Sequence, residues 1–178
     1  MENTAENLVS QQSPQLENKV RLNLGCGHAI LEGWINVDKY NPRAEVKADI
    51  LKLPFAANSA DEILMSHVIE HLPWRKHIDI FESLHRILKM GGKLTLAYPE
   101  FEKCALNFIN NKGGKKWSWW IQTLYGMQTD AGQFHVSPIV SEHLKDQLTE
   151  VGFTAFELVE DESDSCLTCI KCNPLPWY

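Results

Sequence analysis

The chain has 178 residues, of which 44% are hydrophobic and 22% charged. This balance excludes a disordered or fibrous protein and is typical of one globular domain. The formal net charge of −6 argues against broad, sequence-independent binding to nucleic acid or anionic lipid. No apolar stretch approaches the roughly 20 residues of a membrane span, and no secretory signal opens the chain, so we expect a cytoplasmic location.

Residues 1–19 are rich in Gln, Asn, Glu and Ser, which predicts a mobile polar leader. A single domain is expected over residues 20–178. Short apolar runs predict strands at residues 20–24, 34–37, 45–48, 62–65 and 93–98. Because the connection between the first two strands is short, any helix in it has a turn or two at most.

Apolar side chains recur with helical period over residues 74–89 and 140–151. Gly91-Gly92 and Gly152 are expected to end these helices. Residues 153–160 and 166–171 then look like an antiparallel pair. Strands alternating with helices predict an α/β fold with a doubly wound sheet, parallel in its first five strands and with one antiparallel strand near the C-terminus.

In such a sheet, ligands bind at the carboxyl ends of the strands. The residues expected there are Gly25-Cys26-Gly27, Asp38, Asp49, Ser66 and His67. The glycine turn lacks the third glycine of a dinucleotide fingerprint, since Ile30 occupies its place, so a pyrophosphate is disfavoured. A carboxylate at Asp38 can accept both hydroxyls of a ribose, and Asp49 the amine of an adenine. The pattern favours an adenosine without phosphates.

Five segments carry a family resemblance: residues 22–28 (LNLGCGH), 33–38 (GWINVD), 47–55 (KADILKLPF), 59–72 (SADEILMSHVIEHL) and 87–99 (ILKMGGKLTLAYP). In order and spacing they resemble the class I S-adenosylmethionine-dependent methyltransferases. The segments beyond residue 99 are similar to small methyltransferases found with polysaccharide-biosynthesis genes. The resemblance implies a Rossmann-like, mostly parallel, seven-stranded sheet with an antiparallel C-terminal strand. It also implies S-adenosyl-L-methionine as cofactor and S-adenosyl-L-homocysteine as product.

The resemblance further implies which residues hold the cofactor. Asp38 would hold the ribose hydroxyls, Asp49 and Ile50 would contact the adenine, and Lys39 or Tyr40 would pack on its ring. Ser66 and His67 would lie beside the sulfonium. The full expected set is Asn23, Leu24, Gly25, Cys26, Gly27, Asp38, Lys39, Asp49, Ile50, Ser66 and His67.

Methyl transfer to an alcohol needs a base, and histidine is the usual choice near neutral pH. The candidates are His67, His71 and His135. His67, Glu70 and His71 are spaced to share one face of any helix after the fourth strand. We expect no metal there. The alternative is a divalent ion at this cluster, with His135 as a further ligand, in an RNA 2′-O-methyltransferase.

Two further segments have competing interpretations. Cys166, Cys169 and Cys172 lack a fourth cysteine, and we expect them to be strand residues that do not hold a metal together. Residues 112–120 combine lysines and tryptophans, which indicates either a nucleic-acid or membrane surface or a lid. We favour a lid within an insertion at about residues 101–138, with Trp117, Trp120, Ile121 and Leu124 as its buried face.

Taken together, the sequence predicts a methyltransferase acting on an oxygen or nitrogen of a small molecule, with a saccharide or glycan precursor as the leading acceptor. The alternative from another class is a non-catalytic scaffold that binds S-adenosylmethionine. Nucleic-acid partners are not expected. The oligomeric state is not predicted.

Overall fold

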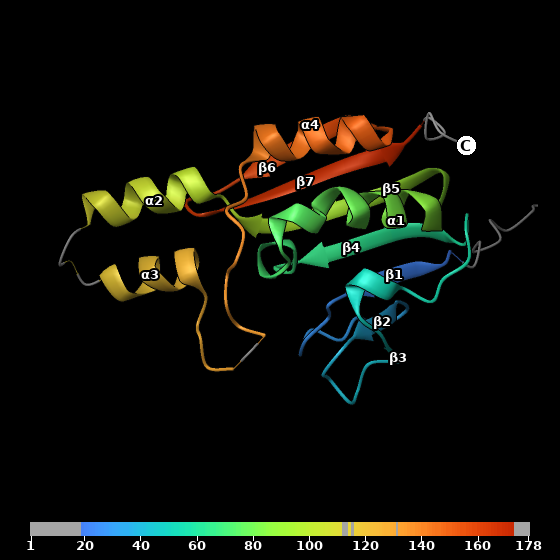
Figure 1. The fold of residues 1–178 in the computed structure, drawn as a ribbon, viewed down its shortest axis with the longest axis horizontal. Coiled ribbons are helices and arrows are strands. Elements are labelled where there is room, and N and C mark those ends of the chain that lie inside the picture. The colour runs from blue at the N-terminus through green and yellow to red at the C-terminus, as the bar shows by residue number, and fades with distance from the viewer. Residues whose placement is uncertain (1–18, 112–113, 115, 131, 173–178) are drawn as a thin grey trace, which may run out of the picture.

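The computed structural model describes residues 19–172, apart from 112–113, 115 and 131 (Figure 1). The predicted leader over residues 1–19 therefore lies almost wholly outside the described residues. In the described part of the chain, no helix combines the length and apolar character that crossing a bilayer requires.

The strands form a seven-stranded sheet in the order β3-β2-β1-β4-β5-β7-β6. They are β1 (Arg21–Leu24), β2 (Ile35–Asp38), β3 (Val46–Lys47), β4 (Ala60–Ser66), β5 (Leu88–Pro99), β6 (Phe153–Glu160) and β7 (Asp164–Lys171). Strands β1 to β5 run parallel, whereas β7 pairs antiparallel with both β5 and β6. The predicted Rossmann-like mixed sheet with an antiparallel C-terminal strand is confirmed.

Two helices, α1 (His77–Ile87) and α4 (Ser141–Val151), pack side by side over one face of the sheet (Figure 1). Their apolar side chains meet those of the central strands in one core, which excludes water from Phe81, Leu84 and Leu148. Gly152 ends α4 in the left-handed conformation, as predicted. The connection from β1 to β2 consists of turns without a helix, in agreement with its short length.

The predicted helix over residues 74–89 is wrong at both ends. It begins with a separate 3₁₀ turn, η3 (Trp74–Lys76), and it ends at Ile87. Leu88 is already extended and pairs with Ala60 of β4, so Gly91 and Gly92 lie inside strand β5. Pairing with β4 outweighs the helical pattern of apolar residues here. It provides hydrogen bonds for the backbone of residues that the pattern assigned to the helix.

Two further helices, α2 (Phe101–Asn110) and α3 (Trp117–Tyr125), form a hairpin at the end of the sheet toward which β4 points (Figure 1). The segment that follows α3 returns past this end of the sheet before α4 begins (Figure 1). The predicted insertion is therefore a helical hairpin with an extended return segment, and it lies beside the carboxyl ends of the parallel strands.

Candidate functional site

The strand order reverses between β1 and β4, where the chain leaves toward β2 on one side and toward β5 on the other. A crevice at such a switch point is where open α/β sheets bind ligands. Gly25 follows β1 with a φ of +65°, and a Cβ at this position would lie 2.6 Å from Val68 Cγ2, just beyond β4. The glycine therefore lets the two strand ends pack directly against each other.

Replacing Gly25 by alanine is expected to destabilise the fold by about 2–4 kcal/mol, combining left-handed backbone strain with overpacking against Val68. Gly33→Ala is the matched control, since Gly33 also has a positive φ but its Cβ would meet nothing within 4 Å. The control should lose only about 1–2 kcal/mol. Urea unfolding of both variants measures the difference, and equal losses would show that the Val68 contact does not matter.

Asp38 ends β2 with its carboxylate turned back toward the glycine turn. Its Oδ2 accepts the Gly27 N–H at 2.9 Å, and its Oδ1 accepts the N–H groups of Tyr40 and Asn41 at 2.7 and 2.8 Å. Burial alone would raise the pKa of Asp38, but these backbone hydrogen bonds outweigh it and lower the pKa. The carboxylate is therefore ionised at neutral pH, with lone pairs left for further donors.

Gly27 faces open space, because a Cβ placed on it would meet no atom within 4 Å. A ligand can therefore approach this backbone closely, directly beside the Asp38 carboxylate. A charged acceptor therefore lies next to an exposed glycine turn, and the predicted contact of Asp38 with a ribose remains a prediction.

The Asn23 side chain makes its hydrogen bonds within the protein. It is 3% exposed, and its amide donates to the Ala29 carbonyl and to Asn36 Oδ1, both at 2.8 Å. Asn36 in turn is held by Glu45. These buried amides shape the turn between β1 and β2. Asn36 was not predicted from the sequence, although a polar residue in a buried strand is the signal that points to it.

Lys39 and Asp49 form an ion pair, with Lys39 Nζ 2.8 Å from Asp49 Oδ2. The other oxygen of Asp49 accepts the Leu51 N–H at 3.0 Å and caps the 3₁₀ turn η1 (Ile50–Lys52). The hydrogen bond from Lys39 lowers the pKa of Asp49. The side chain of Ile50 belongs to the core. Adenine contacts by these residues remain predictions.

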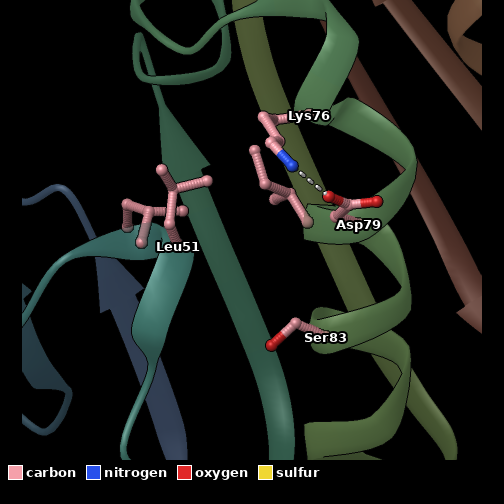
Figure 2. Close-up of a pocket in the computed structure, with 6 residues that line it drawn as sticks. Leu51, Lys76, Asp79 and Ser83 are labelled. Atoms are coloured by element: carbon pink, nitrogen blue, oxygen red, sulfur yellow. Dashed lines mark hydrogen bonds and ion pairs between the residues drawn. The ribbon is translucent and has the colours of Figure 1, made fainter.

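A pocket lies between η1 and the start of α1 (Figure 2). Its lining consists of Ile50, Leu51, Lys76, Asp79, Ile80 and Ser83. Lys76 and Asp79 form an ion pair at 2.8 Å on the α1 side of this pocket (Figure 2). None of the residues of the glycine turn lines this pocket, and neither does Asp38. This pocket is therefore separate from the glycine turn and from Asp38.

His67 directly follows β4 and has a φ of +53°, which is unusual for a residue with a side chain. Strained backbone of this kind clusters at functional sites. Its Nδ1 lies 3.4 Å from Glu70 Oε1, and this contact raises the pKa of His67. The expectation that His67 shares a helix face with Glu70 and His71 is wrong, because His67 precedes the 3₁₀ turn η2 (Ile69–His71).

The return segment of the insertion docks onto η2. The Glu70 carbonyl accepts the N–H groups of Val136 and Ser137 at 2.8 and 3.1 Å. This docking places the rings of His71 and His135 edge to face, with centroids 4.7 Å apart. Burial lowers the pKa of His135. The structure thus brings all three candidate histidines together around Glu70.

Glu100 is a buried carboxylate that the sequence did not reveal. It follows β5, is 4% exposed, and accepts hydrogen bonds from the hydroxyls of Ser141 and Ser165. The Ser141 hydroxyl is also 2.9 Å from the Tyr98 hydroxyl. This network ties the end of β5 to the start of α4, and it accounts for the burial of Glu100.

The hairpin only partly matches the expected lid face. Trp120 is fully buried, but Trp117 is 42% exposed because it occupies the first position of α3, where its neighbour is Phe108. Ile121 and Leu124 are half-buried. Lys112 and Lys115 lie outside the described residues.

The cysteine run lies where it was predicted. Cys166 and Cys169 are in strand β7, and the Cys169 thiol is part of the core. Burial raises the pKa of Cys169 to about 12, which keeps the thiol protonated.

The comparisons with known proteins agree with this geometry. Residues 30–96 match the family model described as a methyltransferase domain. A sterol 24-C-methyltransferase of Pneumocystis carinii is 28% identical over 133 residues, which is 75% of this chain but 30% of that protein. The chain thus spans about a third of the length of this relative.

Solved structures share the fold. A SAM-dependent methyltransferase of Archaeoglobus fulgidus superimposes with a TM-score of 0.61 at 15% identity, covering 86% of each chain. A Burkholderia thailandensis 1,6-didemethyltoxoflavin-N1-methyltransferase with bound S-adenosylhomocysteine gives a TM-score of 0.58 at 12% identity, covering 87% of this chain and 72% of that one. Residues 30–96 thus match a methyltransferase domain, and the 3-2-1-4-5-7-6 sheet gives this chain the fold of the class I S-adenosylmethionine-dependent methyltransferases that it resembles.

Proposed function

We propose that this protein transfers the methyl group of S-adenosylmethionine to an oxygen or nitrogen of a small molecule. One observation carries the proposal: the glycine turn beside Asp38 and the histidine cluster adjoin each other at the switch point of the sheet. Gly25 packs against Val68, which lies between His67 and η2. A ligand lying over the glycine turn therefore extends toward the cluster.

Some residues of this chain would bind the cofactor, and others would accept a proton from the acceptor. When bound, the cofactor supplies a methyl carbon activated by the positive sulfur. Asp38 would hold the ribose hydroxyls, and the open backbone at Gly27 would admit the rest of the cofactor. Alignment and exclusion of water then account for much of the rate.

The acceptor site would lie between η2 and the return segment of the insertion. An alcohol acceptor must lose its proton as the new bond forms, and an imidazole can take it. The side chain of His67 is 49% exposed and is the most accessible candidate base described. Phe134 and Tyr125, both exposed beside the cluster, would contact the acceptor.

The proposal also names a chemical class for the methyl acceptor. A hydroxyl-bearing saccharide or glycan precursor is proposed from the resemblance to small methyltransferases of polysaccharide clusters. The two named relatives methylate the carbon and the nitrogen that their names state, so they leave the acceptor of this chain open.

Calorimetry with S-adenosylhomocysteine, followed by methyl-transfer assays on sugar nucleotides, alcohols and amines, tests the proposal. We expect binding in the micromolar range and turnover of at least one acceptor class. Absence of binding at millimolar ligand would refute the proposal. Binding without turnover across the panel would favour the scaffold, and salt-dependent RNA binding would favour the RNA enzyme.

A further inference from the structure

The carboxylate of Glu70 is buried, and no hydrogen bond from the described part of the chain satisfies either of its oxygens. The residue is 1% exposed, and neither carboxylate oxygen has a hydrogen-bond partner among the described residues. The His67 ring is in ion-pair range of one oxygen at 3.4 Å, but it does not make a hydrogen bond to it. Buried charges are normally paired or coordinate a metal, so this carboxylate calls for a cation.

Two imidazoles beside this carboxylate are oriented by backbone carbonyls. His71 Nδ1 is 3.0 Å from the Phe134 carbonyl, and His135 Nδ1 is 2.9 Å from the Thr123 carbonyl. A carbonyl oxygen only accepts, so each Nδ1 is assigned as the donor and Nε2 is the nitrogen left to offer a lone pair to a metal. This arrangement, in which one nitrogen donates to a carbonyl and the other is free, is the usual one for histidines that bind a metal.

The three side chains converge. Glu70, His71 and His135 each offer one ligand atom, and these atoms all lie within 4.8 Å of one another. Two imidazoles and one carboxylate form a donor set that suits Zn²⁺ and related transition metals, whereas Mg²⁺ and Ca²⁺ prefer oxygen ligands. With three protein ligands, a tetrahedral ion keeps one position open for water or a substrate oxygen.

We propose that Glu70, His71 and His135 form a binding site for a divalent transition metal ion of the Zn²⁺ class, on the acceptor side of the crevice. The cluster considered from the sequence also included His67, which is not among the side chains whose ligand atoms converge here. His67 remains free to accept a proton. The open position would receive an acceptor hydroxyl, and this last part alone rests on the proposed function.

Metal binding is tested on the full chain after chelation and dialysis. Titration with Zn²⁺ is expected to show one tight site per chain and a rise in Tm on saturation. Glu70→Gln keeps the shape of the side chain but removes the charge, so Zn²⁺ affinity should fall by at least about 100-fold, more than the loss of a supporting hydrogen bond causes. His135→Ala should have the same effect, while His143→Ala, on the exposed side of α4, should have none.

Free cysteines also bind Zn²⁺, so a Zn²⁺ titration alone does not identify the ligands. The absorption spectrum of bound Co²⁺ does. Ligation by imidazole and carboxylate gives the visible absorption of tetrahedral Co²⁺ without the near-ultraviolet charge-transfer band of a thiolate ligand. A thiolate band, or Zn²⁺ affinity unchanged in Glu70→Gln, would overturn the proposal, as would no binding by wild type. Circular dichroism confirms that each variant is folded.

Binding of S-adenosylhomocysteine to the metal-free protein separates this proposal from the proposed function. We expect cofactor affinity to be independent of Zn²⁺, since Asp38 and Gly27 do not belong to the metal cluster. A protein that binds Zn²⁺ through these ligands but does not bind the cofactor would refute the proposed function and leave the metal site standing. The opposite result would refute the metal site alone.

Discussion

Asp38→Ala is expected to weaken the binding of S-adenosylhomocysteine by more than tenfold. The ribose hydroxyls would lose a charged acceptor, and hydrogen bonds to charged groups contribute about 1.5–3 kcal/mol. The change also orphans the N–H groups of Gly27, Tyr40 and Asn41, which now donate to this carboxylate. We therefore expect some loss of stability as well, although Asp38 appeared from the sequence to serve the cofactor alone. Calorimetry gives the affinity, and urea unfolding gives the stability.

Asp38→Asn separates these two effects, because the amide oxygen can still accept from the N–H groups of Tyr40 and Asn41 but carries no charge. It should retain most of the stability and still bind more weakly. Asp79→Ala is the matched control, since Asp79 is a carboxylate of the pocket between η1 and α1 (Figure 2). The affinity of Asp79→Ala for S-adenosylhomocysteine should be unchanged. A large loss in Asp79→Ala with none in Asp38→Asn would move the nucleoside to that pocket.

Trp120→Ala is expected to destabilise the helical hairpin by about 3–5 kcal/mol, the usual cost of truncating a buried tryptophan. Trp120 is fully buried, packs edge to face on Trp119 with centroids 4.4 Å apart, and lies outside the main core cluster. The hairpin thus depends on a small apolar cluster of its own. Because Thr123 and the return segment support His135, unfolding of the hairpin should also loosen the histidine cluster.

Hydrogen exchange measures this prediction, since protection of the α2 and α3 amides should fall while that of β1 and β4 stays unchanged. Trp120→Phe keeps an aromatic ring and removes an indole N–H that has no hydrogen-bond partner among the described residues, so it should cost much less. Trp119→Ala is the exposed control. Unchanged protection of α3 in Trp120→Ala would show that the hairpin is not held by this side chain.

Local sequence patterns determined the strands and much of the crevice. Each of the first four strands is a short apolar run that ends at a glycine, an aspartate or a polar residue. Strand ends in a parallel sheet lie on one edge, so the glycine turn and Asp38 were predicted to be neighbours, and the Gly27 N–H does donate to Asp38. This prediction was reliable because the glycine turn directly follows β1 and Asp38 ends β2, so each is positioned by the strand next to it in the sequence.

Side chains with long-range partners behaved differently. From the sequence, Asn23 was assigned to the cofactor, and its side-chain amide donates to Asn36 and Ala29. The helix expected up to residue 89 ends at Ile87, since β4 pairs with Leu88. In both cases the structure adds a tertiary hydrogen bond that the local pattern did not indicate.

The sequence by itself therefore determined the parallel strands, the glycine turn and the place of the Asp38 carboxylate beside it, because these depend on neighbours along the chain. Only the tertiary structure decided that His135 joins Glu70 and His71, since the hydrogen bond that docks the return segment spans 63 positions, from His71 to Phe134. No periodicity records a contact of that kind. It forms because the hairpin brings the return segment back to η2, where the backbone of Glu70 accepts its amides.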